Sequence, residues 1–548
     1  MKEIENIKNV FIHTIIGFSI KSNERDPKKG EENMKHHIYY KYLEFNDEKF
    51  FTICLLPGKN GKFPVVISRS PYVNHTVDMP EEKIMQDYYH SAKYWLERGY
   101  ALLFQHCKGQ GKSTGAFVPY VHEREDGLAF REWVRRQPFY NGEIYLVGGS
   151  YTASLHYATA PFEADVKGAI FEVQDSERYR LWYRNGQMRK GHANWHFGLY
   201  KAKCNLHKKF DMRSFSKIPI KGVSNSTFGE YAHDFEQMLE ASSPSHEFWS
   251  TRFGGVDTKD AVTDADIPIL LTTGYNDFYV GGVFKMWQRM SEQTKRKSAL
   301  LVSPYNHGDD YDQENGIPFP NGQRRQAFGG DYQIAWLDHI RKGTPLPYKT
   351  GVITYYRVFE NGWQSDFFQP ATKDLTIPLG TGSFCFDYDP LCPPSFRGEG
   401  LLVEDLQGRS DVLSICTPAF DADTFVKGQM KIMLAVESNV PDTSFYVRIS
   451  IKKPEYTYVL RHDITSLCYQ LGDYNENSIA TLEFCFDEYA FLIKKGDCLQ
   501  LDISSTDNNT YVCHTNKKGE YYLQTETEKA ENKIHLDKSC LILPVEPS

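Results

Sequence analysis

The sequence predicts a parallel α/β domain that carries an inserted helical cap and is followed by an all-β sandwich. Up to about residue 360, buried apolar runs of strand length alternate with helical patterns and end in glycine-rich or polar loops. Beyond that point helical periodicity disappears, and short alternating runs separated by turn residues continue toward the C-terminus. The 548 residues are too many for one ordinary core. We therefore expect an N-terminal segment 1–40, an α/β core of 41–176 and 263–360, a cap of 177–262, and a jelly-roll sandwich of 361–548.

Composition excludes several classes of protein. A net charge of -8 over this length argues against non-specific nucleic-acid binding. The apolar run at residues 10–20 is too short to span a bilayer and lacks a cleavage site, so no membrane association is expected. Eleven cysteines without C-x-x-C pairs indicate reduced thiols. Together these features favour a cytoplasmic protein.

The predicted strands before residue 150 end at the sheet edge where a functional site is expected. Residues 63–68 and 99–104 are predicted strands, and the second is followed by the glycine-rich segment 108–113. A helix opens near residue 125 and stops at Gln137-Pro138, after which Asn141-Gly142 turns the chain into a strand at 143–147. Loops at the carboxyl ends of parallel strands meet at one edge of a sheet, so that edge is the expected site.

Gly148-Gly149-Ser150 follows the third of these strands and precedes a predicted helix. Strand, sharp turn and helix are the context of the G-x-S-x-G nucleophile elbow of α/β-hydrolases, although Thr152 occupies the place of the second glycine. A serine hydroxyl needs a base and a carboxylate that orients the base. Asp277 follows the predicted strand 267–272 and His307 follows the strand 298–302, in the chain order that this fold uses. We therefore predict Ser150, Asp277 and His307 as a catalytic triad.

An oxyanion hole requires two donors. The backbone N–H of Tyr151, the residue after the serine, supplies one. No H-G-G-G segment follows an early strand, where Tyr72 is found instead. From the residues alone, Tyr72 is interpreted as a packing residue rather than a catalytic one.

The cap segment is rich in aromatic and charged residues and shows no clean strand. Trp182, Tyr183 and Trp195 of the cap, together with Tyr279, are predicted to line an apolar acyl pocket. The sandwich strands are expected at residues 429–437, 444–451, 456–461, 479–486 and 498–503.

No cofactor and no metal site is predicted. Gly111-Lys112-Ser113 lacks the earlier glycine of a phosphate-binding loop. His192 and His196 have zinc-protease spacing but lack the glutamate base, and the acidic loop 309–312 lacks the glycine pattern of a calcium loop.

These motifs together resemble the CocE/NonD family of serine hydrolases (peptidase family S15), from about residue 45 to the C-terminus. The shared motifs are R-x-P-Y at 69–72, R-G-Y at 98–100, G-x-G-x-S-x-G at 109–115, E-x-E-D-G at 123–127, W-x-x-x-Q-P at 133–138, G-x-S-Y at 148–151, and N-H-G at 306–308. The resemblance implies the signature G-x-S-Y-x-G, with Ala153 in place of the last glycine, and it implies that Tyr72 donates its hydroxyl to the oxyanion.

Two departures from the family pattern bear on substrate. Family members that hydrolyse α-amino-acid esters carry acidic residues after the triad aspartate, where this chain has Phe278, Tyr279 and Val280. A substrate with a free α-amino group is therefore disfavoured. His106-Cys107-Lys108 replaces the usual aspartate-arginine pair, so the sequence does not show which salt bridges form around the loop 109–115.

Three hypotheses follow. The first is a serine hydrolase that cleaves esters, and more slowly amides, of small hydrophobic acyl groups. The second is a peptidase that releases X-Pro dipeptides and anchors the substrate N-terminus on Asp175 or Glu177. The third is a non-catalytic binding scaffold. The expected partner is a small ester, amide or short peptide, and a homodimer is left open.

Overall fold

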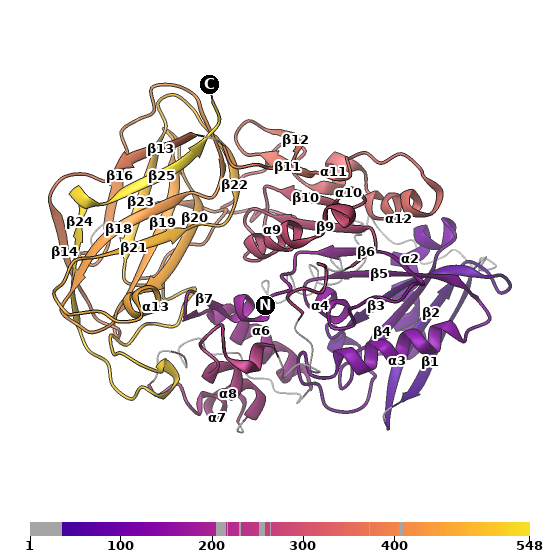
Figure 1. Cartoon of the computed structure of the whole chain (residues 1–548). Helices are drawn as coiled ribbons and strands as arrows, with labels where there is room; N and C mark the ends of the chain where they lie inside the picture. Colours follow the sequence, from indigo (N-terminus) through magenta and orange to yellow (C-terminus); the bar gives the residue numbers. More distant parts are fainter. Residues whose placement is uncertain are drawn as a thin grey trace.

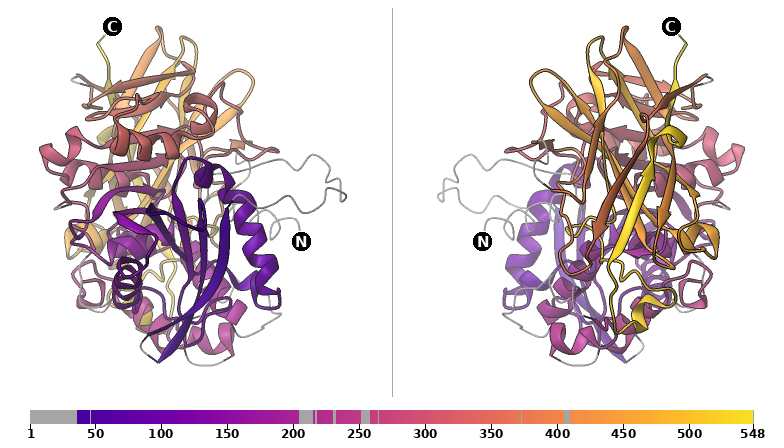
Figure 2. Two further views of the ribbon diagram at one scale, coloured as in Figure 1. Left: turned by 90° about the vertical axis from the view of Figure 1, so that its right-hand side faces the viewer. Right: turned by 90° about the vertical axis from the view of Figure 1, so that its left-hand side faces the viewer.

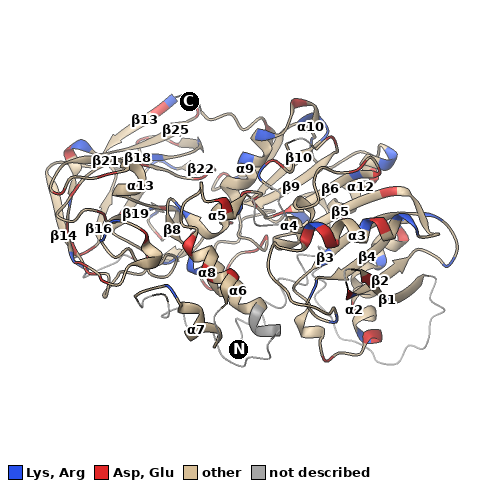
Figure 3. Ribbon diagram, turned by 60° about the horizontal axis from the view of Figure 1, so that its bottom comes forward, with Lys and Arg blue, Asp and Glu red and all other residues tan. Residues whose placement is uncertain are grey.

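The chain forms an α/β part and an all-β part, with helices of the cap between them (Figure 1). This computed structural model describes residues 36–547 except 46, 204–214, 216–217, 230–231, 251–257, 264, 372 and 405–408. Figure 3 shows acidic and basic residues interspersed along the ribbon, without a long run of one sign. Each helix in the described segments is too short or too polar to cross a lipid bilayer.

A ten-stranded sheet forms the centre of the α/β part, in the order β1-β2-β4-β3-β5-β6-β9-β10-β11-β12. Its strands are β1 His37–Phe45, β2 Glu48–Leu56, β3 Phe63–Ser70, β4 Ala101–His106, β5 Tyr140–Gly149, β6 Val166–Glu172, β9 Ile269–Gly274, β10 Ala299–Ser303, β11 Ile353–Arg357 and β12 Gly362–Asp366. Neighbours from β4 to β11 are parallel, and the flanking pairs are antiparallel. The carboxyl ends of β3, β5, β9 and β10 therefore point to one edge of the sheet.

Helices cover both faces of this sheet, because its central strands are apolar on both sides. One face is packed by α2 (Glu81–Glu97) and α12 (Tyr332–Lys342), and the other by α3 (Glu123–Arg135), α4 (Tyr151–Tyr157) and α9 (Val280–Arg289). The shorter elements are η1 Asn74–Thr76, α10 Glu292–Arg296 and α11 Arg324–Phe328. In Figure 2 (left) the N-terminal strands face the viewer and the sandwich lies behind them.

The cap leaves the sheet after β6 and returns at β9. Its elements are α5 Arg178–Trp182, β7 Tyr183–Arg184, β8 Gln187–Met188, α6 Lys190–Lys203, α7 Val223–Phe228, α8 His233–Glu240 and η3 Glu247–Trp249. The short β7-β8 hairpin was not expected from the sequence. An aromatic core, in which Trp182, Phe228 and Phe235 are buried, also contacts Tyr151 and Leu155 of α4, so the cap packs directly against the helix that follows Ser150.

The sandwich consists of two antiparallel sheets. One has the order β14-β24-β18-β25-β17-β22, with β13 paired to β25 and β21 to β18; the other has the order β15-β20-β19-β23-β16. The elements are β13 Lys373–Pro378, β14 Ser383–Tyr388, β15 Leu402–Val403, β16 Leu413–Cys416, β17 Thr424–Gly428, β18 Lys431–Ser438, β19 Ser444–Lys452, β20 Thr457–Ser466, α13 Leu467–Leu471, β21 Ala480–Cys485, β22 Tyr489–Ile493, β23 Cys498–Ser504, η4 Tyr521–Leu523, β24 Ala530–His535, η5 Leu536–Lys538 and β25 Cys540–Val545.

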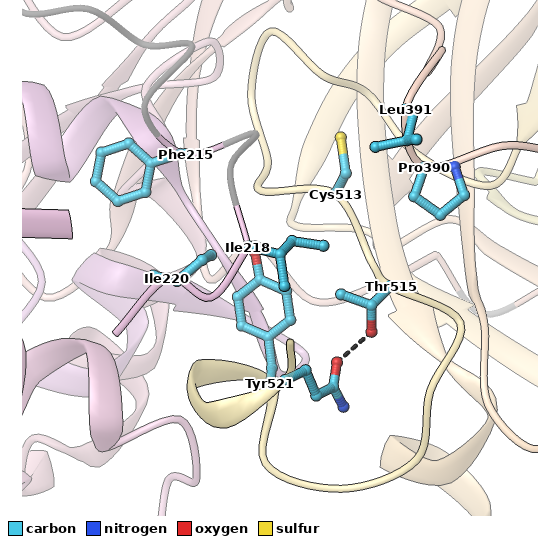
Figure 4. Close-up of a pocket in the computed structure, with 9 residues that line it drawn as sticks. Phe215, Ile218, Ile220, Pro390, Leu391, Cys513, Thr515 and Tyr521 are labelled. Atoms are coloured by element: carbon cyan, nitrogen blue, oxygen red, sulfur yellow. Dashed lines mark hydrogen bonds between the residues drawn. The ribbon is translucent and has the colours of Figure 1, made fainter. Parts of the chain in front are cut away.

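Arg184 of the cap forms ion pairs with two carboxylates of the sandwich. Arg184 pairs with Asp463 at 2.7 Å and with Asp487 at 3.1 Å. Asp487 also lies against the start of α9, where a Cβ added at Gly281 would come within 2.1 Å of its carboxylate. Glycine is therefore required there for the sandwich to approach the helix that follows Asp277. Figure 4 shows a small apolar pocket between the cap and the sandwich, lined among others by Ile220, Leu391 and Tyr521.

The predicted fold class, an α/β core with a cap and a C-terminal all-β domain, is confirmed. Strand β12 still belongs to the core sheet, so the change from one sheet to the next falls after residue 366 rather than at 360. Residues 1–35, most of the expected N-terminal segment, lie outside the described residues.

Candidate active site

Ser150 occupies a strained turn between β5 and α4. Its backbone has φ 54° and ψ -135°, a conformation that is costly for any residue with a Cβ and that is found mainly at functional sites. The Ser150 N–H donates to the Glu172 carbonyl at 2.9 Å, and the Thr152 hydroxyl bridges the N–H and C=O of Gly149 at 2.6 and 2.7 Å. These bonds hold the turn and leave the serine hydroxyl at the end of the strand.

The two small residues around Ser150 have different roles. A Cβ at Gly148 would lie 2.5 Å from the Thr152 carbonyl oxygen, so glycine is required at that position. Ala153 is fully buried in the first turn of α4, where the backbone is helical and glycine is not needed. The missing second glycine of the motif therefore does not disturb the turn.

Asp277 and His307 meet at the ends of neighbouring parallel strands. Asp277 follows β9 and His307 follows β10, and His307 Nδ1 lies 3.1 Å from Asp277 Oδ1. The Asp277 carboxylate is fully buried and accepts from the Tyr279 N–H at 3.1 Å and from the Thr273 hydroxyl at 3.3 Å. Because the carboxylate is held at both oxygens, it fixes the orientation of the imidazole.

Tyr72 lies beside Ser150. Its hydroxyl hydrogen-bonds the Ser150 side chain and the Tyr151 backbone, and the Trp195 indole N–H donates to it at 3.2 Å. Burial raises the pKa of Tyr72 to about 12, against smaller lowering effects of these three hydrogen bonds. The phenol is therefore protonated at ordinary pH and can donate. The structure thus brings Tyr72 to the serine, where the residues alone had indicated packing.

A buried ion cluster links the segments that carry the two donor groups. The Tyr151 hydroxyl donates to Glu123 at 2.6 Å, and Arg69, three residues before Tyr72, lies 3.6 Å from the same carboxylate. Arg69 also lies 3.5 Å from Asp126. Glu123 therefore connects the loop of Tyr72 with the turn of Ser150 through charge and hydrogen bonds.

The same cluster supplies the salt bridges that the sequence left open where His106-Cys107-Lys108 replaces the usual aspartate-arginine pair. His106 and Cys107 are buried; burial lowers the pKa of His106 to about 3 and raises that of the Cys107 thiol well above its usual value. Both side chains are therefore neutral at ordinary pH. The charge pairing at this place comes from Arg69 of β3 with the two carboxylates of α3.

The four predicted pocket residues fall into two groups. Trp195 packs 5.2 Å from the Tyr151 ring, and Tyr279 meets the His307 ring edge-on at 5.5 Å. Trp182 and Tyr183 instead lie in the aromatic core of the cap, where the Tyr183 hydroxyl donates to backbone carbonyls of α8. The first pair lies beside Tyr151 and His307 of the candidate site, and the second pair supports the cap.

Two residues beside the site were not singled out for it from the sequence. The Phe278 ring stacks on His307 at 5.1 Å, and Phe278 is 45% exposed, which places it at the surface over the imidazole. His192 Nε2 lies 2.8 Å from the Tyr279 hydroxyl. The i, i+4 spacing of His192 and His196 matches a zinc pattern in the sequence and does not indicate this contact. Burial lowers the pKa of both histidines, to about 3 for His196. No cluster of three or more metal-binding side chains occurs in the described part of the chain.

The two carboxylates considered as anchors for a peptide N-terminus are paired. Asp175 is buried and lies 3.1 Å from Arg180 Nε, while Glu177 lies 3.3 Å from Arg289. Each therefore already has a cationic partner.

Comparison with known proteins gives two family matches. Residues 52–309 match the X-Pro dipeptidyl-peptidase (S15 family) model, and residues 364–541 match the C-terminal non-catalytic domain of X-Pro dipeptidyl-peptidases. A cocaine esterase from Rhodococcus sp. (strain MB1 Bresler) is 22% identical over 456 residues, which cover 72% of this chain and 76% of the esterase.

Solved structures share the fold over nearly the whole chain. An α-amino acid ester hydrolase superposes with a TM-score of 0.78 at 17% identity and covers 96% of this chain and 100% of its own. A CocE/NonD family hydrolase from Staphylococcus aureus has a TM-score of 0.65 at 16% identity and covers 95% and 99%. At these identities the structural likeness shows the fold alone.

Proposed function

Because this chain belongs to the CocE/NonD serine hydrolases of peptidase family S15, we propose that it cleaves ester or amide bonds of small hydrophobic acyl substrates through an acyl-enzyme on Ser150. The observation that carries the assignment is the convergence of the Ser150 hydroxyl, the Tyr72 hydroxyl and the Tyr151 N–H at one strained turn. A serine held only for structure does not need an unfavourable backbone conformation beside two donors.

The chemistry begins with proton transfer. His307 accepts the Ser150 proton as the oxygen attacks the carbonyl carbon, and the imidazolium that forms is stabilised by Asp277 at 3.1 Å. The tetrahedral intermediate collapses when His307 donates that proton to the leaving group. Water then attacks the acyl-enzyme with His307 again as the base, which releases the acid and restores Ser150.

Tyr72 and the Tyr151 N–H are proposed to bind the oxyanion. Preorganised donors stabilise charge that develops only in the transition state. A phenol with a pKa of about 12 remains a donor across the working range, whereas an ordinary tyrosine begins to lose its proton near pH 10.

Replacing Tyr72 with phenylalanine is expected to lower kcat for p-nitrophenyl butyrate about 100-fold, with a smaller effect on KM, because it removes one of the two donors. Wild-type kcat/KM should show no loss between pH 8 and 10 from ionisation of this phenol, since its raised pKa keeps the proton in place. Steady-state kinetics across pH on both proteins measures both effects. A Tyr72→Phe variant with wild-type kcat would assign Tyr72 to packing.

The side chains around the triad favour an apolar acyl group. Trp195 and Tyr279 present rings beside Ser150 and His307, and Phe278 covers the imidazole. Where family members that act on α-amino-acid esters carry acids after the triad aspartate, this chain has Phe278 and Tyr279. An ammonium group would find no carboxylate at these two positions.

X-Pro dipeptidyl-peptidase activity is the second candidate, since both matching family models carry that description. It requires an anion for the substrate N-terminus, and Asp175 and Glu177 are each held by an arginine. The ester hypothesis therefore has the stronger support from the geometry.

A fluorophosphonate probe tests the proposal directly. We expect one adduct by intact mass, mapped to the peptide that contains Ser150, together with turnover of p-nitrophenyl acetate and butyrate. A parallel assay with Gly-Pro p-nitroanilide and its N-acetyl analogue separates the two candidates, because a peptidase prefers the free amine. Folded protein that neither labels nor hydrolyses any of these substrates would favour the binding-scaffold hypothesis.

A further inference from the structure

Arg189 lies at the edge of the candidate active site. It follows β8 and precedes α6, and its N–H donates to the Trp182 carbonyl at 2.8 Å. Its guanidinium Nη1 donates to the Phe278 carbonyl at 3.2 Å, and the Phe278 ring stacks on His307. The guanidinium is therefore fixed to the residue that directly follows Asp277.

Arg189 differs from neighbouring arginines of the cap because no residue in the described part of the chain serves as its counter-ion. Arg180 pairs with Asp175, and Arg184 pairs with Asp463 and Asp487. For Arg189, no carboxylate lies within ion-pair distance among the residues that the structure describes, and its buried Nε has no hydrogen-bond partner there. Among those residues the guanidinium donates to the neutral Phe278 carbonyl, so its charge and its remaining Nη donors fit a carboxylate supplied by a ligand.

The charge of Arg189 acts on the groups around the triad. The pKa of His192 lies well below its usual value, first because of burial and next because of the charge of Arg189. Burial raises the pKa of Tyr279 well above its usual value, and Arg189 opposes that rise. Both groups are therefore neutral at ordinary pH. The positive potential at this edge is local, since the chain as a whole carries a net charge of -8 and does not attract anions generally.

We propose that Arg189 binds a carboxylate carried by the ester or amide substrate, an inference that rests on the hydrolase function proposed above. A guanidinium offers several donors in one plane, which match the two oxygens of a carboxylate. The same charge repels an ammonium group, which agrees with the aromatic residues found after Asp277. The substrate class is thus an apolar acyl ester or amide with one anionic end.

Two pairs of substrates test this and locate the carboxylate. The acyl pair is mono-p-nitrophenyl adipate against p-nitrophenyl hexanoate. The leaving-group pair is o-nitrophenyl butyrate against the same ester with a carboxylate on the ring. In each pair the measured quantity is the ratio of kcat/KM for the charged ester to that for the neutral one.

In the pair that places the carboxylate at Arg189, we expect Arg189→Gln to lower this ratio about 10- to 100-fold, because a hydrogen-bonded charge is lost. Arg189→Lys should lower it less, since the charge remains and the planar fork does not. Arg409→Gln is the matched control: it removes an equal charge from an exposed arginine of the sandwich, which pairs with Asp411, and should leave both ratios unchanged.

The outcomes separate the inference from the function on which it rests. Ratios that are equal in wild type and Arg189→Gln for both pairs overturn the carboxylate site, while hydrolysis of the neutral esters still supports the hydrolase. Absence of neutral-ester hydrolysis in wild type instead overturns the proposed function. If Arg189→Gln does not fold, Arg189→Lys still decides, because an unchanged ratio in that variant contradicts recognition by the planar fork.

Discussion

Replacing Ser150 with alanine is expected to lower kcat for p-nitrophenyl butyrate by about 10⁴-fold or more and to abolish fluorophosphonate labelling. Loss of the nucleophile removes the acyl-enzyme route and leaves only what the oxyanion donors and substrate binding supply. Stopped assays at high enzyme concentration, with the spontaneous rate subtracted, measure the residual turnover.

Ser154→Ala is the matched control for this experiment. Ser154 lies in the same helix α4, is buried like Ser150, and its hydroxyl accepts from Gln174 at 2.6 Å. The control variant should label normally, which separates the loss of one nucleophile from a general disturbance of the helix. Ser150→Ala protein that keeps a tenth of the wild-type kcat would show that another residue attacks the substrate.

Much of the candidate triad could be predicted because it depends on chain order rather than on side-chain packing. Parallel strands end at one edge of a sheet, so that edge carries Ser150 after β5, Asp277 after β9 and His307 after β10, and the last two lie 3.1 Å apart. The position of Tyr72 could not be derived in this way. Its hydroxyl reaches Ser150 only because the loop after β3 is held by buried polar contacts that join residues far apart in the chain.

The cap shows the limit of a compositional argument. Trp182 and Trp195 belong to the same aromatic-rich segment, yet one is buried in the cap core and the other donates to Tyr72. Which ring faces the serine depends on how α5 and α6 pack on α4, and no periodicity in the sequence specifies that packing. Helix α2 was missed for a related reason: its buried positions, such as Ile84 and Trp95, are sparse among polar residues and tyrosines.

A role for Arg189 could not be predicted from the sequence, because the function of a guanidinium depends on its contacts in the folded protein. Arg180, Arg184 and Arg189 lie within ten positions of one another in the cap. Arg180 pairs with Asp175, a near neighbour in sequence, whereas Arg184 pairs with Asp463 of the sandwich, which is distant in sequence. The absence of such a carboxylate for Arg189, among the residues described, is a property of the folded molecule.

Replacing Asp277 with alanine is expected to lower kcat about 10⁴-fold, because His307 loses both its orientation and the charge that stabilises the imidazolium. Asp277→Asn should be less damaging, with a loss of about 100- to 1000-fold. Its amide oxygen can remain at the Oδ1 position, where it accepts from the Tyr279 N–H and from His307 Nδ1. The NH₂ group then faces the Thr273 hydroxyl, which can act as acceptor, so the correct tautomer of the imidazole is kept and only the negative charge is lost.

Thr273→Val tests that arrangement. Alone it removes one hydrogen bond to a carboxylate that retains two others, and it should lower kcat only a few-fold. Combined with Asp277→Asn, it removes the acceptor for the amide NH₂, so the amide loses its preferred orientation and the combined loss should exceed the product of the two single losses. Thermal unfolding of each variant shows whether the buried site is intact. If Asp277→Asn is as slow as Asp277→Ala and Thr273→Val adds nothing to it, the amide presents its NH₂ to His307, and the hydrogen bond from Tyr279 does not control the orientation of this side chain.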